Sequence, residues 1–448
     1  MRCLLTVWNF PGCVHPFFAL GEALRARGHE VAVYTGAEYE RSVREQGFAF
    51  FPFHRALEEV VAQRVYSPDS IGANWHRPWK VPRLLKEFMV DSMPAQIGDL
   101  NRVYAVWRPD VVASDPALLA PYMVQYERTG VPVALLSYVL GCQIPGPDIP
   151  PVGLGLPLPK TRWQAMSNRL TGKVMDLFLS DFRTSVDRIR VRYGLKPLGR
   201  SIVEAARRLP LYLVTSCPEL DYPRTDLPET VHYVGACFWY PRQHTPPPWL
   251  ETLPSDPPCV YVNEGTIHVA APFLLRAARE GLAKAPIQVV LTTGTHRSMA
   301  DLGLAPLPDN FLADQWIDHD LLLPKMSAMV CTGGPGTVLS ALRNGVPMVV
   351  VATEWDHPEN AQRMAEAGVA LRLERRHCTA QGLRAAVERV LGDPSFRHNA
   401  ERISRALARQ GGPGRAAELL ERLPAAAQQR SFTHHHGTGS AGASAPAS

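Results

Sequence analysis

The 448-residue sequence lacks the patterns that mark several common kinds of protein. Its 8 cysteines show neither Cys-x-x-Cys spacing nor a His/Cys ligand pattern, which argues against a disulfide scaffold or a zinc site, so we expect free thiols and no metal. No apolar run approaches the roughly 18 residues of a membrane span. Residues 1–10 lack the small-residue cleavage site of a signal peptide, and we therefore expect a cytoplasmic protein.

Other missing features narrow the choice of partner. The net charge is only +5 and comes from scattered arginines without any basic block, which argues against nucleic acid. No Gly-x-Gly-x-x-Gly follows the first apolar run, so the turn typical of a nicotinamide-dependent oxidoreductase is absent. Hydrophobic content of 46% and charged content of 20% are ordinary for a globular enzyme of about two or three domains.

Short apolar runs alternate with amphipathic stretches through most of the chain. The pattern predicts strands at residues 3–8, 30–34, 48–52, 110–114, 133–136 and 211–216, then at 260–263, 288–292, 311–316, 328–331, 348–352 and 370–373. It predicts helices at 16–27, after a loop at 9–14, and at 38–46, 118–128, 272–284, 336–344, 359–367, 379–391, 395–408 and 415–423. We therefore expect an α/β fold of two doubly wound parallel sheets facing each other across a cleft.

Composition suggests where the domains end. The first domain is expected at residues 1–222 and the second at 259–410. Between them, residues 223–258 are rich in proline and predict a linker. Residues 411–424 predict a helix that crosses back onto the first domain. Residues 425–448 lack apolar periodicity and are expected to be disordered.

The most informative run joins an apolar strand at 328–331, a glycine-rich turn and a helix. Such a turn points unpaired backbone N–H groups and the positive end of a helix dipole at one place, which favours an anion. The strand at 348–352 then ends in a loop with Asp356 and His357. Because open α/β sheets bind ligands at the carboxyl ends of neighbouring strands, phosphate on one loop and hydroxyls on the other suggest a sugar nucleotide.

Several ordered motifs match a known family. They are Gly-Cys-Val-His-Pro at 12–16, Ala-Leu-Gly-Glu-Ala-Leu-Arg-Ala-Arg-Gly-His-Glu-Val at 19–31, Pro-Glu-Leu-Asp-Tyr-Pro at 218–223, and the loops at 332–337 and 356–360. Up to about Leu423 the chain resembles the family-1 glycosyltransferases of the bacterial branch that decorates natural products. The resemblance implies the GT-B fold, in which a first Rossmann-like domain binds the acceptor and a second binds the sugar nucleotide. It also implies inverting transfer of a sugar from a TDP- or UDP-sugar to a small molecule, with no cofactor.

The resemblance also assigns donor residues. The nucleoside diphosphate is expected near Gly265, Thr266, Trp316, Ile317, Thr332, Gly333, Gly334, Gly336 and Thr337, and the sugar near Asp356 and His357. Trp316 is expected to stack on the base, unless it is a core aromatic, and Asp356 to accept hydrogen bonds from the sugar, unless it only caps a helix. Thr332, Ser340 and His357 replace the His, Glu and Gln usual in the family. Loss of that Glu favours a thymidine diphosphate donor, whose sugar lacks the 2′-hydroxyl, and His357 suggests a preference for a deoxy or amino sugar.

The catalytic base is the main departure from the family. Cys13 occupies the position of the usual base histidine, and a thiol is a poor base for an alcohol. His15 follows two residues later, with a side-chain pKa ordinarily near neutrality. Asp115 resembles the acidic partner that orients the histidine, so we favour a His15–Asp115 pair, with Asp115 alone as the alternative base if burial raises its pKa. Without a catalytic role, His15 would begin a helix and Asp115 would cap one.

An apolar or aromatic small-molecule acceptor is expected near the base. Phe10, Phe17, Phe18 and Tyr138 are candidate contacts, although each aromatic alone fits a core position as well. A homodimer is compatible with the sequence. Because Cys13, Thr332 and Ser340 are altered together, the alternative to an active transferase is a non-catalytic auxiliary or nucleotide-binding relative.

Overall fold

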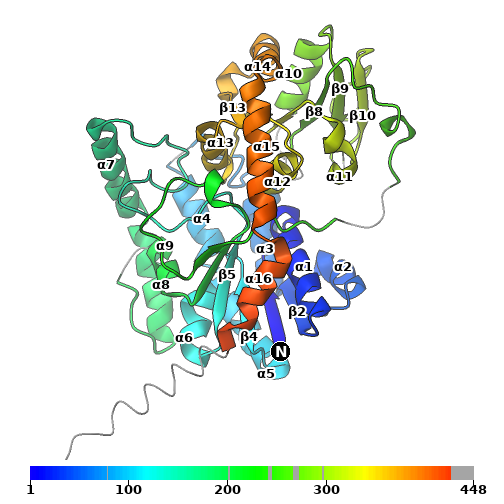
Figure 1. Ribbon diagram of the computed structural model, residues 1–448. Helices are drawn as coiled ribbons and strands as arrows, with labels where there is room; N and C mark the ends of the chain where they lie inside the picture. Colours follow the sequence, from blue (N-terminus) through cyan, green and yellow to red (C-terminus); the bar gives the residue numbers. More distant parts are fainter. Residues whose placement is uncertain (78, 200–201, 241–244, 266–271, 295–296, 425–448) are drawn as a thin grey trace, which may run out of the picture.

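The computed structural model describes residues 1–77, 79–199, 202–240, 245–265, 272–294 and 297–424. It contains two parallel sheets with helices packed around each (Figure 1). One sheet has seven strands in the order β3-β2-β1-β4-β5-β6-β7, and the other has six in the order β10-β9-β8-β11-β12-β13. The expected α/β fold with two doubly wound sheets is confirmed. Thr266 and the tail at 425–448 lie outside the described residues.

The strands are short and mostly buried on both faces, as their continuous apolar runs predict. Those of the first sheet are β1 (Arg2–Thr6), β2 (Glu30–Thr35), β3 (Ala49–Pro52), β4 (Val111–Ser114), β5 (Val133–Ser137), β6 (Leu211–Val214) and β7 (Val231–Tyr233). Those of the second are β8 (Cys259–Asn263), β9 (Gln288–Thr292), β10 (Phe311–Asp314), β11 (Ala328–Cys331), β12 (Met348–Val350) and β13 (Ala370–Arg372). Every strand except β7 overlaps a run predicted from the sequence.

β7 lies inside the stretch that the sequence analysis expects to be a linker. It pairs in parallel with β6 and forms the edge of the first sheet. Its three residues are all half-buried, and the polar His232 between Val231 and Tyr233 interrupts the continuous apolar run that would mark a strand. The first sheet therefore extends past residue 222, and the connection to β8 begins after Tyr233.

Helices connect the strands. In the first half they are α1 (Pro11–Ala26), α2 (Glu40–Glu45), α3 (Arg55–Val61), α4 (Val81–Met89), α5 (Met93–Trp107), α6 (Tyr126–Thr129), α7 (Arg162–Phe178), α8 (Ser180–Arg192) and α9 (Ile202–Ala205). In the second half they are α10 (Phe273–Leu282), α11 (His319–Leu322), α12 (Pro335–Arg343), α13 (His357–Glu366), α14 (Ala380–Gly392), α15 (Pro394–Arg409) and α16 (Gly412–Glu421). Helices α3, α4, α5, α7, α8, α9 and α11 occupy stretches where the sequence analysis predicts none. No helix in the described part of the chain is long and apolar enough to cross a bilayer.

Helix α1 begins five residues earlier than predicted, and this changes the setting of the candidate base. Pro11 occupies the first turn, where its fixed φ suits the helix and its missing N–H costs nothing. The N–H groups of Cys13 and Val14 donate to the carbonyl of Phe10 at 2.9 and 2.8 Å. Pro16, predicted to start the helix, lies inside it. The predicted loop at 9–14 is therefore largely the first turn of α1.

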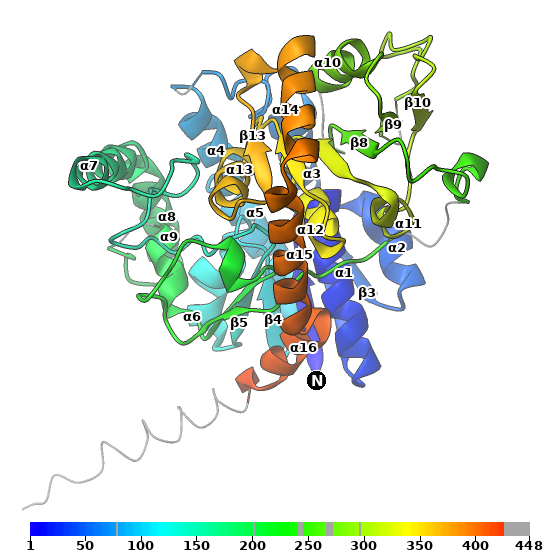
Figure 2. The same cartoon turned by 45° about the horizontal axis from the view of Figure 1, so that its top comes forward.

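The C-terminal helix α16 packs on the first half of the molecule, beside α1 (Figure 2). Ala416, Ala417 and Leu420 join the hydrophobic core that surrounds the first sheet. Glu421 accepts hydrogen bonds from Arg27 at 2.7 Å and lies 2.6 Å from Nε2 of His29. Residues far apart in the sequence thus tie the second half of the chain back to the first.

Candidate active site

A cavity of about 330 Å³ lies between the two sheets, at the carboxyl ends of their strands. Most residues expected to act at the site line it: Phe10, Cys13, His15, Tyr138, Gly265, Trp316, Ile317, Thr332, Gly334, Gly336, Thr337, Asp356 and His357. Asp115 lies just behind the wall, next to Ala117, which does line it. Phe17 and Phe18 are fully buried in the core of the first half, so the structure assigns both to packing rather than to acceptor contact.

The start of α12 forms an anion-binding wall on the second half. Gly334 is the N-cap and Pro335 the first helical residue, so the N–H groups of Gly336 and Thr337 have no partner within the helix. No acidic side chain occupies this first turn, which leaves the positive end of the helix dipole uncompensated. This geometry suits a diphosphate.

Gly333 is required by the close packing of the two loops. Its φ is +99°, and a Cβ there would lie 3.1 Å from Cγ1 of Val350 and 3.3 Å from the carbonyl oxygen of His357. Only a residue without a side chain permits both this backbone conformation and this approach. The glycine turn is thereby held directly against the start of α13.

Asn360 joins the two loops chemically. Its amide nitrogen donates to Oδ2 of Asp356 at 2.7 Å and to the carbonyl of Gly333 at 3.0 Å. It stands one helical turn after Asp356, which places both side chains on one face of α13. The sequence analysis noted the motif at 356–360 but gave Asn360 no role of its own. The structure shows that it fixes the Asp356 carboxylate relative to the glycine turn.

Three altered family positions have local partners. Thr332 is buried and donates through Oγ1 to the carbonyl of Glu264 at 3.2 Å, which ties the ends of β8 and β11 together. Ser340 is also buried and donates to the carbonyl of Gly336 at 2.9 Å. Nδ1 of His357 lies 2.9 Å from Oγ1 of Thr353. Glu264 caps α10 by accepting from the N–H of Leu274 at 2.8 Å.

On the opposite side, Asp115 is completely buried after β4. Its carboxylate accepts from the N–H of Ala117 at 2.7 Å and of Trp8 at 3.4 Å, and the hydroxyl of Tyr138 lies 3.4 Å from both of its oxygens. Burial raises the pKa of Asp115 to about 7, although these hydrogen bonds act to lower it. The phenol of Tyr138 lines the cavity and connects this carboxylate to it.

Cys13 and His15 both line the cavity, but they face different neighbours. Burial raises the pKa of Cys13 well above its ordinary value, so the group stays a thiol. Burial lowers the pKa of His15 to about 4, so its imidazole is neutral at neutral pH. The ring centroids of His15 and Trp239 are 5.1 Å apart.

The favoured His15–Asp115 pair is not formed. Among the residues that the structure describes, no hydrogen bond or ion pair joins the two, and Asp115 has no part in the shift of the His15 pKa. The reason lies in α1, because residues two apart on a helix point about 200° away from each other. Once the segment is helical, Cys13 and His15 cannot both face Tyr138 and Asp115.

The connection between the sheets also contributes to the cavity, which the sequence analysis missed. Cys237, Phe238, Trp239 and Tyr240 all line it. The hydroxyls of Tyr240 and Ser340 lie 3.3 Å apart. The proline content of this segment concealed the aromatic run that it carries.

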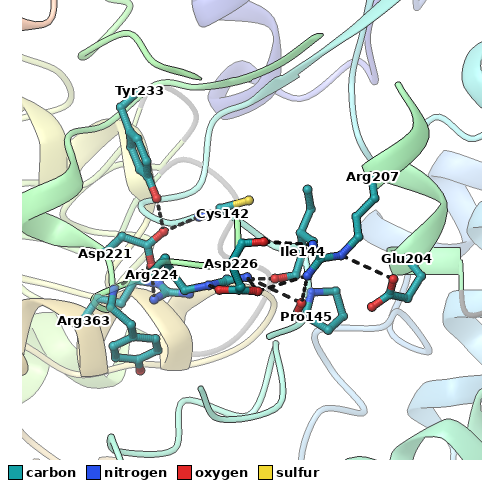
Figure 3. A network of polar contacts seen from close by, with 11 residues as sticks. Cys142, Ile144, Pro145, Glu204, Arg207, Asp221, Arg224, Asp226, Tyr233 and Arg363 are labelled. Carbon is teal, nitrogen blue, oxygen red and sulfur yellow. Dashed lines mark hydrogen bonds and ion pairs between the residues drawn. The ribbon is translucent and has the colours of Figure 1, made fainter. Parts of the chain in front are cut away.

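A buried polar network fastens α13 to the first half of the molecule. Nη1 of Arg363 lies 2.6 Å from Oδ1 of Asp221, and Nη2 lies 2.9 Å from Oε1 of Glu359. Figure 3 shows Asp221 between Arg363, Tyr233 and the backbone of Cys142, with a second cluster around Asp226 beside it. Asp356, at the start of α13, is thus held relative to the first sheet.

Within the described ranges, no group of three or more His, Cys, Asp or Glu side chains is arranged to hold a metal ion.

Comparison with known proteins identifies the family. Residues 282–423 match the family described as erythromycin biosynthesis protein CIII-like, C-terminal domain. The chain is 32% identical over 435 residues to 4′-demethylrebeccamycin synthase of Lentzea aerocolonigenes, covering 94% of this chain and 99% of the relative. It is 30% identical over 414 residues to a PGL/p-HBAD biosynthesis rhamnosyltransferase of Mycobacterium bovis (strain BCG / Pasteur 1173P2), covering 91% and 84%.

The fold agrees with these matches. A spinosyn rhamnosyltransferase, solved in complex with thymidine diphosphate, superposes with a TM-score of 0.69 at 21% identity, over 94% of this chain and 100% of that one. The GT-B arrangement of two Rossmann-like halves is therefore confirmed. The chain belongs to the family-1 glycosyltransferases of bacterial natural-product biosynthesis and is a sugar-nucleotide-dependent glycosyltransferase.

Proposed function

We propose that the enzyme transfers a sugar from a thymidine or uridine diphosphate sugar to a hydroxyl of a small-molecule natural product, with inversion and without a metal. One observation carries the proposal. The free N–H groups of α12 and the carboxylate of Asp356 line one side of a single cavity, and Tyr138, backed by Asp115, lines the other. A leaving group, a sugar and an acceptor hydroxyl can therefore be held in line.

The donor side supports thymidine diphosphate. In the family, a glutamate usually binds the ribose hydroxyls, and the resemblance places Ser340 there. The Ser340 hydroxyl is buried and donates to the carbonyl of Gly336, so this position offers no carboxylate to a 2′-hydroxyl. The relative solved with thymidine diphosphate supports the same choice.

Departure of the diphosphate is assisted by the chain itself. The N–H groups of Gly336 and Thr337 and the dipole of α12 stabilise the charge that develops as the bond from the anomeric carbon to the phosphate oxygen breaks. Such fixed donors need no reorganisation during the reaction. These donors can stabilise the leaving diphosphate without a metal ion.

Asp115 is the base in this proposal. The acceptor oxygen forms a bond to the anomeric carbon while its proton passes to the hydroxyl of Tyr138, which gives its own proton to Asp115. A pKa of about 7 suits a general base that works near neutral pH. A single displacement of this kind inverts the anomeric configuration. The relative named 4′-demethylrebeccamycin synthase and the matching family named for an erythromycin biosynthesis protein support a natural-product acceptor.

Calorimetric titration of the purified chain with thymidine diphosphate and uridine diphosphate, in EDTA and then in magnesium, tests the donor side. Binding of thymidine diphosphate in EDTA that is tighter than binding of uridine diphosphate supports the proposal. Binding of either nucleotide only when magnesium is present contradicts it. The stereochemistry is read by NMR from the anomeric coupling of product formed from an α-linked thymidine diphosphate glucose. A product with the retained anomeric configuration would contradict the inverting mechanism. Binding of the nucleotide without any transfer of sugar would favour the non-catalytic alternative.

A further inference from the structure

Trp355 has a backbone conformation that bulky residues rarely adopt. It and Arg108 are the two non-glycine residues with positive φ in the part of the chain that the structure describes, at 59° and 51°. Arg108 ends α5, where a left-handed residue is common. Trp355 instead stands in the turn between β12 and α13, immediately before Asp356. Such strain persists only where the surroundings hold it, and it concentrates at functional sites.

The surroundings that hold Trp355 belong to the first half of the molecule. Its ring stacks on Trp75, with centroids 6.5 Å apart and planes at 30°. The edge of Phe88 lies against it, with centroids 6.2 Å apart and planes at 70°. Next to it, the carboxyl group of Glu354 lies 3.6 Å from where a side chain on Gly72 would begin. The turn from the second sheet thus rests on the acceptor side of the cleft.

The indole of Trp355 is also part of the cavity wall. Trp355 is half-buried and lines the cavity, whereas Trp75 is outside the lining and supports it from behind. Trp8, Phe10 and Phe88 continue the same wall, and the ring centroids of Trp8 and Phe88 are 4.4 Å apart. These side chains give this part of the cavity flat aromatic walls.

We propose that Trp355 is an acceptor-binding residue supplied by the donor half of the enzyme, and that the acceptor is a planar, aromatic, hydroxylated ring system stacked on its indole. This inference rests on the proposed function and names its substrate class. A flat π surface gains from parallel contact with indole and phenyl faces, whereas a saturated ring gains only apolar burial. The left-handed turn that presents Trp355 also sets the position of Asp356. One short segment therefore aligns the acceptor ring and the sugar.

The test separates the ring of Trp355 from its backbone. Trp355→Gly removes the indole and tolerates a φ of 59°, and Trp355→Phe retains an aromatic face. Trp163→Ala is the matched control, because Trp163 is 77% exposed on α7 and is not part of the cavity wall. Three probes are titrated separately: alizarin as a planar phenol, androsterone as a saturated alcohol, and thymidine diphosphate.

We expect Trp355→Gly to weaken alizarin binding by about ten- to a hundred-fold, the range of a lost aromatic stacking contact, and Trp355→Phe by a smaller factor. Thymidine diphosphate binding should change by less than about twofold, because the N–H groups of α12 are untouched. Unchanged alizarin binding in Trp355→Gly overturns the inference, as does equal loss of alizarin and thymidine diphosphate, or tighter binding of androsterone than alizarin by the unaltered enzyme. If alizarin binding depends on Trp355 but thymidine diphosphate does not bind at all, the donor assignment is contradicted while this inference stands.

Discussion

Arg363 of α13 and Asp221 of the first half form an ion pair in which each side chain is 2% exposed and the nitrogen and oxygen lie 2.6 Å apart. The guanidinium also lies over the ring of Tyr222, 4.1 Å from its centroid. Glu359, the second carboxylate on Arg363, accepts from the N–H groups of Gly153 and Gly155 at 3.2 Å. The helix that begins beside Asp356 is thus fixed to the first half of the molecule through Arg363 and Glu359.

Replacing Arg363 with methionine should destabilise the protein by about 3–5 kcal/mol, because it leaves two buried carboxylates without their cation. The change is measured as the free energy of unfolding in urea. Arg409→Met is the control, since Arg409 is 64% exposed and pairs with the half-buried Glu219, and ion pairs of exposed side chains contribute less than about 1 kcal/mol. If both substitutions lowered the free energy of unfolding equally, the buried pair would stabilise the protein no more than the control pair does.

The acidic limb of the pH–rate profile should report Asp115. Burial raises its pKa to about 7, so kcat/KM should rise with pH and level off above an apparent pKa near 7. Asp115→Asn should lower kcat by about a hundred-fold or more and remove this limb, while thymidine diphosphate still binds. His15→Ala should keep the limb, because the pKa of His15 is lowered to about 4. A limb that disappears in His15→Ala would return the base role to the histidine.

The carboxyl group of Asp115 should also make the free energy of unfolding depend on pH, in the direction opposite to that of a salt-bridged aspartate. Its folded-state pKa is above the unfolded value, so the native state binds more protons between about pH 4 and 7. Its contribution to the free energy of unfolding is therefore greatest below pH 4 and falls as pH rises through 7. Asp115→Asn should flatten the stability curve over this window. An unchanged slope in thermal unfolding at matched pH values would contradict the raised pKa.

Asn360 should control the sugar and diphosphate loops together. It is completely buried and donates to both Asp356 and the carbonyl of Gly333. Asn360→Leu leaves the buried carbonyl of Gly333 unsatisfied, which costs about 1–3 kcal/mol, and also removes the donor to the half-buried Asp356. We expect weaker binding of thymidine diphosphate and of its sugar conjugate alike. Asp356→Ala should weaken only the sugar conjugate, and titration of both ligands with both variants distinguishes the two roles.

Much of this architecture follows from local sequence signals. The apolar runs predict every strand except β7, because strands buried on both faces need continuous apolar residues. The glycine turn before α12 and the loop carrying Asp356 are predictable because strand, turn and helix are adjacent in the chain. Both loops line the cavity in the structure.

What the sequence does not predict depends on contacts between distant segments. The pair of His15 with Asp115 assumes a loop before residue 15, but Pro11 starts α1 there and turns His15 toward Trp239. Phe17 and Phe18 look like acceptor contacts from their nearness to Cys13, yet the helix directs them into the core. The approach of Trp355 to Trp75 joins residues 280 positions apart, and no periodicity reveals such a contact.

Gly333→Ala should impair the donor site with little effect on the acceptor wall. The new Cβ would meet Val350 at 3.1 Å and the carbonyl of His357 at 3.3 Å, in a backbone conformation that L-residues rarely adopt. The expected cost is about 1–3 kcal/mol, and because the turn borders the N–H groups of Gly336 and Thr337, it should appear as weaker thymidine diphosphate binding. Gly98→Ala is the control, since nothing lies within 4 Å of its added carbon, it lies inside α5 and it is not part of the cavity wall. Titration that found the Gly333 variant as tight as the control would mean that the glycine turn does not shape the nucleotide site.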